Sequence, residues 1–166
     1  MSSRPEYVLA VDPGLAGALC LLRCSGLKIE GVFDMPVTDG RVDAARLALI
    51  VGMCQLRGTI VAAVERVGSR PHQAHAFSFG TDFGIVLGVL GSLGVTTTLI
   101  QPVQWKSSYG LRRATDETQA GTKTRARVLA SKLWPESAKL FARVKDSDRA
   151  EASLIGRFWA SKNEWL

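Results

Sequence analysis

The sequence has 166 residues, of which 46% are hydrophobic and 22% are charged. This composition is typical of an ordinary globular protein, and the length suits one domain with a sizeable core. We therefore expect one domain over residues 1–166. Residues 83–100 carry no charge and reach the length of a short membrane span. Glycines and a threonine run interrupt this stretch, so we expect no membrane span.

The formal net charge is +6, and all of it lies in the last third of the chain. Residues 1–103 hold eight basic and eight acidic residues, whereas residues 104–166 hold thirteen and seven. Basic character concentrated in one part of a chain indicates a polyanionic partner, most often nucleic acid. The alternative is a charged surface that serves only solubility.

The three cysteines, Cys20, Cys24 and Cys54, form no CxxC pair, and two of them fall in apolar patterns. We interpret them as reduced core residues and not as metal ligands. The first six residues contain no apolar segment typical of a secretory signal. We therefore expect an intracellular protein.

The chain begins with an apolar hairpin. Tyr7–Val11 and Ala18–Leu22 have the nearly continuous apolar pattern of buried strands, and Asp12-Pro13-Gly14 lies between them. A carboxylate at the end of a central strand is costly to desolvate unless it meets a cation or hydrogen-bond donors. Asp12 is therefore either a site residue or an ordinary turn residue that bonds nearby backbone N–H groups.

A third strand is predicted over residues 27–35, followed by a turn over 36–40 and a helix over 42–56. The strand Thr59–Glu65 follows, apolar except for its last residue. A helix between this strand and the hairpin predicts a crossover, so this strand should run parallel to the first. Asp12 and Glu65 would then lie at the same sheet edge, where α/β folds place their ligand sites. This coincidence favours a metal or acid–base site.

Residues 66–75 are predicted to form a polar loop beside this edge, and its two histidines are more typical of exposed residues than of ligands. A helix is predicted over residues 74–93. Gly80, Gly84 and Gly88 line one face of it, which indicates close approach by another element. Packing within the chain is slightly favoured over a dimer contact. Three phenylalanines, Phe77, Phe79 and Phe83, would be core residues or a stacking surface at the site.

After a strand over residues 95–100, a polar and aromatic segment covers residues 101–106. Residues 112–122 show no periodicity and are predicted to form a mobile loop. A basic helix is predicted over residues 123–133, and Trp134-Pro135 should end it.

Asp148 and Glu151 lie three positions apart at the start of the last predicted helix, so they share one helix face. One interpretation is a capping pattern with Asp148 as the N-cap residue. However, Glu151 lies on the same stripe as Leu154 and Phe158, which should face the sheet. This placement favours a catalytic role for the pair over capping alone.

Two strand-end carboxylates and two helix carboxylates together suit hard divalent cations, because Mg²⁺ prefers oxygen ligands. Two such ions can activate a water molecule and stabilise the leaving oxygen of a phosphodiester. With a basic C-terminal third to hold phosphates, the residues predict metal-dependent hydrolysis of nucleic acid.

The order of these motifs resembles the RuvC-type Holliday junction resolvases of the ribonuclease H-like superfamily, closest to their phage and organellar branch. The resemblance rests on the Asp12-Pro13-Gly14 turn, on Glu65 at a strand end and on the helix start Asp148-Arg149-Ala150-Glu151-Ala152. The phenylalanine- and glycine-rich segment from Phe77 to Lys106 is also similar to that branch, so the match covers nearly the whole chain.

The resemblance implies an α/β ribonuclease H-like fold, with a five-stranded mixed sheet flanked by helices. It implies a homodimer that makes paired nicks in a four-way DNA junction with Mg²⁺ or Mn²⁺, two ions per site. Such a protein would work in the cytoplasm or nucleoid of a bacterial or phage-infected cell, or in an organelle of a eukaryote. The catalytic and metal-binding residues would be Asp12, Glu65, Asp148 and Glu151, with Asp146 as an alternative to Asp148. The implied nucleic-acid contacts are Lys106, Lys123, Arg125, Lys145 and Arg149.

Two other functions remain open from the sequence. The chain could bind DNA junctions without cleaving them, or it could cleave RNA–DNA hybrids with the same fold. An actin-like kinase also has an Asp-x-Gly turn in its first hairpin, but it needs a second domain for which 166 residues leave no room. A two-fold enzyme suits a near two-fold substrate, which favours the junction.

Overall fold

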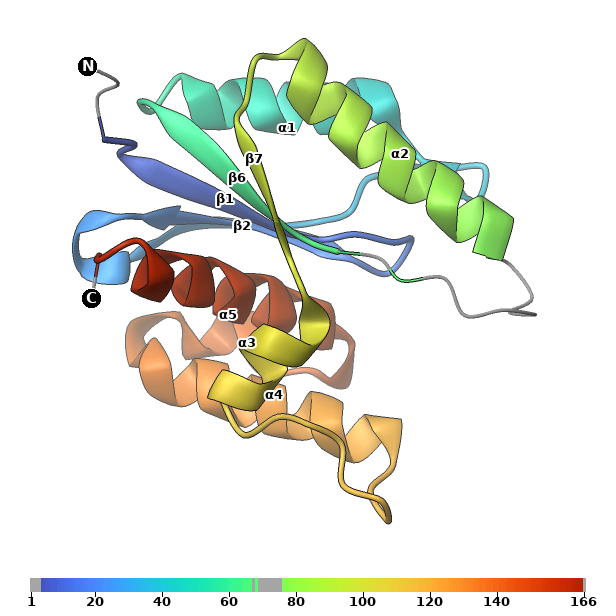
Figure 1. Ribbon diagram of the computed structural model, residues 1–166, viewed down its shortest axis with the longest axis vertical. Helices are drawn as coiled ribbons and strands as arrows, with labels where there is room; N and C mark the ends of the chain where they lie inside the picture. Colours follow the sequence, from blue (N-terminus) through green and yellow to red (C-terminus); the bar gives the residue numbers. More distant parts are fainter. Residues whose placement is uncertain (1–3, 67, 69–75, 166) are drawn as a thin grey trace.

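The computed structural model describes residues 4–66, 68 and 76–165. Its centre is a five-stranded sheet in the order β3-β2-β1-β6-β7 (Figure 1). The strands are β1 (Tyr7–Asp12), β2 (Ala18–Arg23), β3 (Ile29–Asp34), β6 (Ile60–Glu65) and β7 (Thr97–Ile100). β1, β2 and β3 form an antiparallel meander, and β6 and β7 continue the sheet in parallel with β1. The predicted mixed sheet and the parallel crossover are both confirmed.

The helices are α1 (Ala44–Gln55), α2 (Ala76–Ser92), α3 (Pro102–Ser108), α4 (Gln119–Leu133) and α5 (Ser147–Lys162). Short 3-10 turns cover Ser25–Leu27, Pro135–Phe141 and Val144–Asp146. A small hairpin of β4 (Val37–Thr38) and β5 (Arg41–Val42) precedes α1. None of the helices in the described part of the chain is long and apolar enough to cross a membrane.

Several predicted boundaries were wrong because side-chain caps, and not hydrophobic periodicity, set the starts of these helices. Asp43 caps α1 by accepting the backbone N–H of Arg46 at 3.0 Å, so this helix begins after Val42. Thr118 caps α4 by accepting the N–H of Gly121 at 3.1 Å, so this helix takes in residues predicted as a mobile loop.

Two further segments differ from the prediction. Residues 101–106, predicted only as a polar and aromatic segment, contain most of α3, which begins at Pro102. Proline suits the first turn of a helix, where its missing N–H would have had no partner. The last helix begins at Ser147, so Asp148 lies inside its first turn and is not the N-cap residue.

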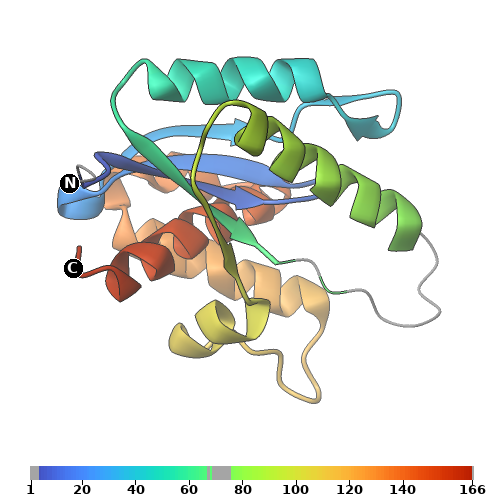
Figure 2. The ribbon, with the colours of Figure 1, turned by 45° about the horizontal axis from the view of Figure 1, so that its top comes forward.

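The sheet separates two layers of helices, α1 and α2 on one face and α3, α4 and α5 on the other (Figures 1 and 2). Alternate residues of the strands enter two separate hydrophobic clusters. Leu9 and Val11 belong to the α1–α2 side, whereas Val8 and Ala10 belong to the α5 side. All four side chains are completely buried, as is typical of a sheet covered on both faces.

Helix α5 packs very close to the sheet. A Cβ atom added to Gly156 would lie 2.6 Å from the side chain of Leu22 and 3.0 Å from the Cβ of Ala10. Only glycine allows this approach, which fixes the height of α5 above β1 and β2.

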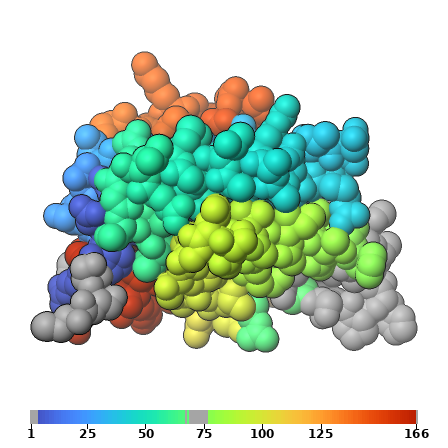
Figure 3. All heavy atoms as spheres, turned by 90° about the horizontal axis from the view of Figure 1, so that it is seen from above, coloured from blue at the N-terminus to red at the C-terminus, as the bar shows by residue number. Residues whose placement is uncertain are grey.

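The glycine face of α2 contacts no other element among the described residues. A Cβ atom added to Gly80, Gly84 or Gly88 would meet no atom within 4 Å in the described part of the structure. The favoured interpretation of packing inside the chain is therefore wrong. Phe77 is 88% exposed at the start of the same helix, whereas Phe83 packs against the α1–α2 cluster. Figure 3 shows α1 and α2 side by side on the face of the molecule that these two helices cover.

The cysteines are free and buried, as predicted. Burial raises the pKa of the Cys20 thiol to about 12 and that of Cys54 to about 11, which makes both unreactive at neutral pH. The two histidines of the predicted loop, His72 and His75, lie outside the described residues.

Candidate active site

Two carboxylates of the site come from the sheet. Asp12 ends β1 and Glu65 ends β6, and the parallel register pairs Val11 with Val64 just before them. Both side chains therefore reach the same edge of the sheet, as the sequence predicted. Asp12 is only 8% exposed, so its charge lies in a poorly solvated position.

Helix α5 brings two more carboxylates to this edge. One carboxylate oxygen each from Asp12, Asp148 and Glu151 lies within 4.8 Å of the other two. Glu65 lies close enough for its charge to be the second-largest cause of the shifted Asp12 pKa, after burial. Three carboxylates that share one small volume form an oxygen-only donor set of the kind that holds Mg²⁺ or Mn²⁺.

The electrostatics of the group favour a bound cation. Burial is the largest cause of an Asp12 pKa well above its ordinary value. Repulsion from Glu65, and then from the two α5 carboxylates, raises it further, while Lys106 acts in the opposite direction. Burial also raises the pKa of Glu65. A divalent ion would offset both the cost of burying these negative charges and the repulsion between them.

Trp105 orients Glu65, a role that the sequence did not reveal. Its indole Nε1–H donates to Glu65 Oε1 at 2.8 Å, and the residue is completely buried. This bond lowers the pKa of Glu65 and partly offsets the effect of burial. A buried tryptophan needs an acceptor for its N–H, but the acceptor lies 40 positions away and only the fold identifies it.

Two lysines reach the carboxylates from α3 and α4. Lys106 Nζ lies 3.4 Å from Glu151 Oε2, and Lys123 Nζ lies 2.8 Å from Asp148 Oδ1. Burial would lower the pKa of Lys123, but its hydrogen bond and attraction to Asp148 raise it overall. The Lys123 ammonium therefore stays charged beside the site.

A cavity of about 510 Å³ opens beside this group. Its lining combines part of the site with side chains of the α3–α4 segment, namely Lys106, Leu111, Arg113, Gln119, Thr122, Lys123 and Glu151. This volume is large enough for a small organic ligand, and two lysines and an arginine line the cavity.

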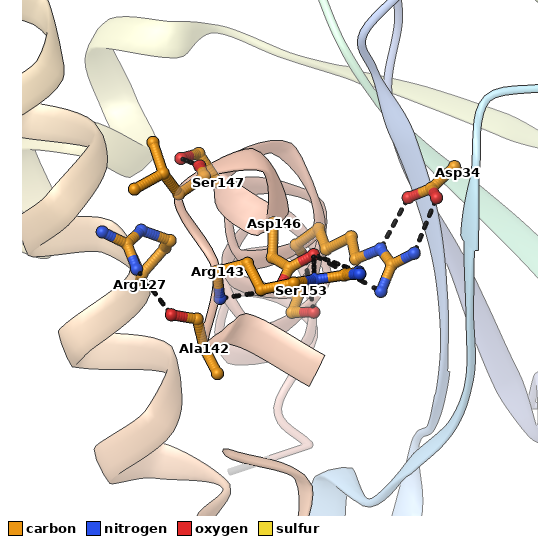
Figure 4. A network of polar contacts seen from close by, with 9 residues as sticks. Asp34, Arg127, Ala142, Arg143, Asp146, Ser147 and Ser153 are labelled. Carbon is orange, nitrogen blue, oxygen red and sulfur yellow. Dashed lines mark hydrogen bonds and ion pairs between the residues drawn. The ribbon is translucent and has the colours of Figure 1, made fainter. Parts of the chain in front are cut away.

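Arg149 links Asp146, just before α5, to Asp34 at the end of β3. Figure 4 labels Asp34, Arg143 and Asp146 in this network of polar contacts. The Arg149 guanidinium donates to both oxygens of Asp34, at 2.5 and 2.6 Å, and lies 3.6 Å from Asp146. The carboxylate of Asp146, which is 1% exposed, also accepts the backbone N–H and the guanidinium of Arg143, each at 2.8 Å. These contacts lower the pKa of Asp146. Asp148, and not Asp146, thus lies in the carboxylate group.

The guanidinium of Arg125 also forms its hydrogen bonds within the chain. It donates to the Glu117 carboxylate at 2.8 and 2.6 Å and to the carbonyl oxygens of Gly110 and Arg112. The hydrogen bonding of Arg125 to the Glu117 carboxylate is the largest cause of a Glu117 pKa lowered to about 2. Arg125 therefore ties the segment before α4 to the helix. Lys145 is exposed on the 3-10 turn before α5.

The chain has the fold of known junction resolvases. It matches the structure of Thermus thermophilus RuvC with a TM-score of 0.61 and 18% identity over 95% of this chain and 96% of that one. T. thermophilus RuvC in complex with its Holliday junction substrate matches with a TM-score of 0.59 and 18% identity over 94% and 96%. The yeast mitochondrial Holliday junction resolvase Ydc2 matches with a TM-score of 0.58 and 14% identity over 97% and 80%.

No protein-family model and no curated protein sequence matches the chain. The structural similarity, which extends over nearly the whole chain, establishes the ribonuclease H-like fold of the RuvC type. In this chain the fold carries a carboxylate group at the end of its central strand.

Proposed function

We propose that the chain is a structure-specific endonuclease that resolves four-way DNA junctions by paired, metal-dependent hydrolysis of phosphodiesters. The observation that carries this proposal is the buried group of Asp12, Asp148 and Glu151 on a RuvC fold. The same fold binds a Holliday junction in the T. thermophilus RuvC complex. Residues 1–166 would then form one nuclease domain. It would act in the compartment of the cell that contains recombining DNA.

Asp12, Glu65, Asp148 and Glu151 would hold one or two Mg²⁺ or Mn²⁺ ions, which supply an activated water and stabilise the leaving oxygen. Asp12 is fixed on a central strand, and Trp105 fixes the orientation of Glu65 through its indole N–H. These rigid supports hold the carboxylates in position before substrate arrives.

The predicted nucleic-acid-binding residues differ in whether they line the cavity beside the carboxylates. Lys106 and Lys123 line it and would contact the phosphate that is cut. Lys145 is exposed and could contact a neighbouring phosphate. Phosphate contacts of Arg125 and Arg149 stay predictions, because neither residue lines this cavity and both guanidinium groups bind carboxylates outside the site, Glu117 and Asp34.

We also infer that two copies pair through the glycine face of α2, which would supply the two sites that paired nicks require. Gly84 and Gly88 have open space above them, and small residues allow two helices to approach closely. Gly84→Leu should leave the monomer folded, since an added Cβ meets no atom within 4 Å, but should block this contact. Gly52→Leu on α1, where an added Cβ also meets no atom within 4 Å, is the matched control.

Sedimentation measures the outcome. The wild-type chain and Gly52→Leu should sediment at twice the chain mass, and Gly84→Leu should sediment as a monomer that no longer makes paired nicks. A wild-type chain that is monomeric at concentrations where it cleaves junctions would contradict the dimer.

The test of function compares a labelled four-way DNA junction with a linear duplex and an RNA–DNA hybrid, each with and without Mg²⁺. Symmetric, metal-dependent nicks in the junction alone would support the proposal. Asp12→Asn should abolish cleavage and spare junction binding, whereas Asp39→Asn, on the exposed β4–β5 turn, should leave both cleavage and binding unchanged. Tight binding without nicks in any metal would indicate a binding module, and preference for the hybrid would indicate the other nuclease class.

A further inference from the structure

The cavity beside the carboxylates contains two exposed polar side chains that the proposed chemistry does not use. Arg113 and Gln119 line it, and both residues are exposed. Within the described part of the chain, neither side chain forms a hydrogen bond or ion pair, in contrast to Lys106 and Lys123, which each contact a carboxylate of the site. Arg113 and Gln119 are therefore free to bind a ligand that enters the cavity.

The chemistry of this lining suits a nucleobase better than a second phosphate. Phosphate oxygens only accept hydrogen bonds, so a phosphate would use the NH₂ group of Gln119 and not its carbonyl oxygen. A base edge offers donors as well as acceptors. Leu111, which is 3% exposed, adds an apolar contribution to the lining, and this suits the face of a ring and not an anion.

The two side chains also indicate the class of base. A guanidinium forms paired hydrogen bonds with O6 and N7 of guanine, and a carboxamide does so with N6 and N7 of adenine. N7 is an acceptor of purines and is shared by both patterns. At the exchange point of a junction a base loses part of its stacking, so moving it into a cavity costs less than in a duplex.

We propose that this cavity receives a purine base adjoining the scissile phosphate, and that Arg113 and Gln119 determine the sequence at which the junction is cut. This inference rests on the proposed function and adds its sequence preference. The phosphate of that nucleotide lies on the side of Lys106 and Lys123, and the base lies against Arg113 and Gln119.

The test uses a pool of four-way junctions with randomised nucleotides around the exchange point, cleaved with Mg²⁺ and sequenced at the cut ends. The wild-type protein should favour a purine at one position beside the cut by about 10- to 100-fold. Arg113→Lys keeps the charge but loses the planar fork, so it should reduce this preference to less than about 3-fold while total junction affinity and its salt dependence stay unchanged. Gln119→Ala, at the first position of α4, should also weaken the preference.

Arg112→Lys is the matched control, because it makes the same change one residue away at a side chain that does not line the cavity. It should keep the wild-type preference. A wild-type protein without a purine preference, or an Arg113→Lys protein that retains it, would overturn the inference and leave the proposed function intact.

A measurement without cleavage separates this failure from failure of the proposed function. The non-cleaving Asp12→Asn protein is bound to a junction that carries the fluorescent purine 2-aminopurine beside the cut position. Emission should rise on binding, because the base leaves its stack, and the rise should disappear when Arg113→Lys is added. An unchanged emission on binding would overturn the inference whether or not the wild-type protein cuts.

Discussion

Replacing Asp12 by asparagine should make the metal-free protein more stable although it removes the proposed activity. Two unit charges 4.8 Å apart repel by about 3.5 kcal/mol at an effective dielectric constant near 20 and by about 1 kcal/mol in water. Asp12 faces more than one such neighbour, and Lys106 offsets part of the repulsion. We expect a gain of about 1–3 kcal/mol, which corresponds to a rise in Tm of about 2–10 °C for a chain of this size.

Asp146→Asn is the control, because it makes the same chemical change at another buried aspartate. The neighbours of Asp146 are positively charged, whereas those of Asp12 are mostly negatively charged. Asp12 is 8% exposed among carboxylates, whereas Asp146 is 1% exposed between two arginines. Weakening its charge-assisted hydrogen bonds should cost about 1.5–3 kcal/mol. The two substitutions should therefore shift stability in opposite directions.

Thermal unfolding in a chelator, from pH 4 to pH 8, measures both effects. The folded-state pKa of Asp12 is raised, so its penalty is absent below its unfolded value near 4 and grows as the pH rises through the folded pKa. The folded-state pKa of Asp146 is lowered, so its contribution is full above its unfolded value and is lost only as the pH falls below it. The reasoning fails if Asp12→Asn is no more stable than the wild-type protein at pH 8 without metal. Added Mn²⁺ should stabilise the wild-type chain more than the variant.

Three further substitutions test other parts of the site. Lys123→Met removes a cation 2.8 Å from Asp148, so the affinity for Mn²⁺, measured by calorimetry, should rise several-fold. The slope of log K for junction binding against log salt concentration should become less steep by about 0.9, and an unchanged slope would contradict a phosphate contact of Lys123. Trp105→Phe removes the donor to Glu65, so it should weaken Mn²⁺ binding and destabilise the fold by about 2 kcal/mol, as urea unfolding would show. Gly156→Ala should cost about 1–3 kcal/mol by the same measurement, because the new Cβ overlaps a β2 side chain; an unaffected protein would mean that α5 can move away from the sheet freely.

The sheet and its two site carboxylates were predictable because local patterns determine them. Apolar runs of strand length predicted the meander, and the helix before Glu65 forced a crossover, which placed this carboxylate at the same edge as Asp12. The phase of Glu151 on the apolar stripe of α5 predicted that it faces the sheet, and the structure buries it at 6% exposure. Each inference needed only a neighbouring stretch of sequence and a general rule of connection.

The pairings between distant side chains were not predictable in this way. The resemblance to the resolvases predicts a phosphate contact for Arg149, but the sequence did not reveal that its guanidinium pairs with Asp34, which lies 115 positions earlier. Charge alone does not say which of the available carboxylates a guanidinium meets. The glycines of α2 similarly predicted close packing, but their sequence could not show that the space above them is empty within the chain.

The presence of two separate hydrophobic clusters on opposite faces of one sheet has a consequence for local opening. Helices α1 and α2 share no cluster with α5, so thermal fluctuations that loosen the first layer need not disturb the second. Amide protons of α1 and α2 should therefore exchange with solvent through local opening of this layer, which costs less free energy than unfolding of the whole chain. Those of β1, which is paired on both sides and covered on both faces, should exchange only when the whole chain unfolds. The strand that ends in Asp12 would then be the last part of the molecule to lose its structure.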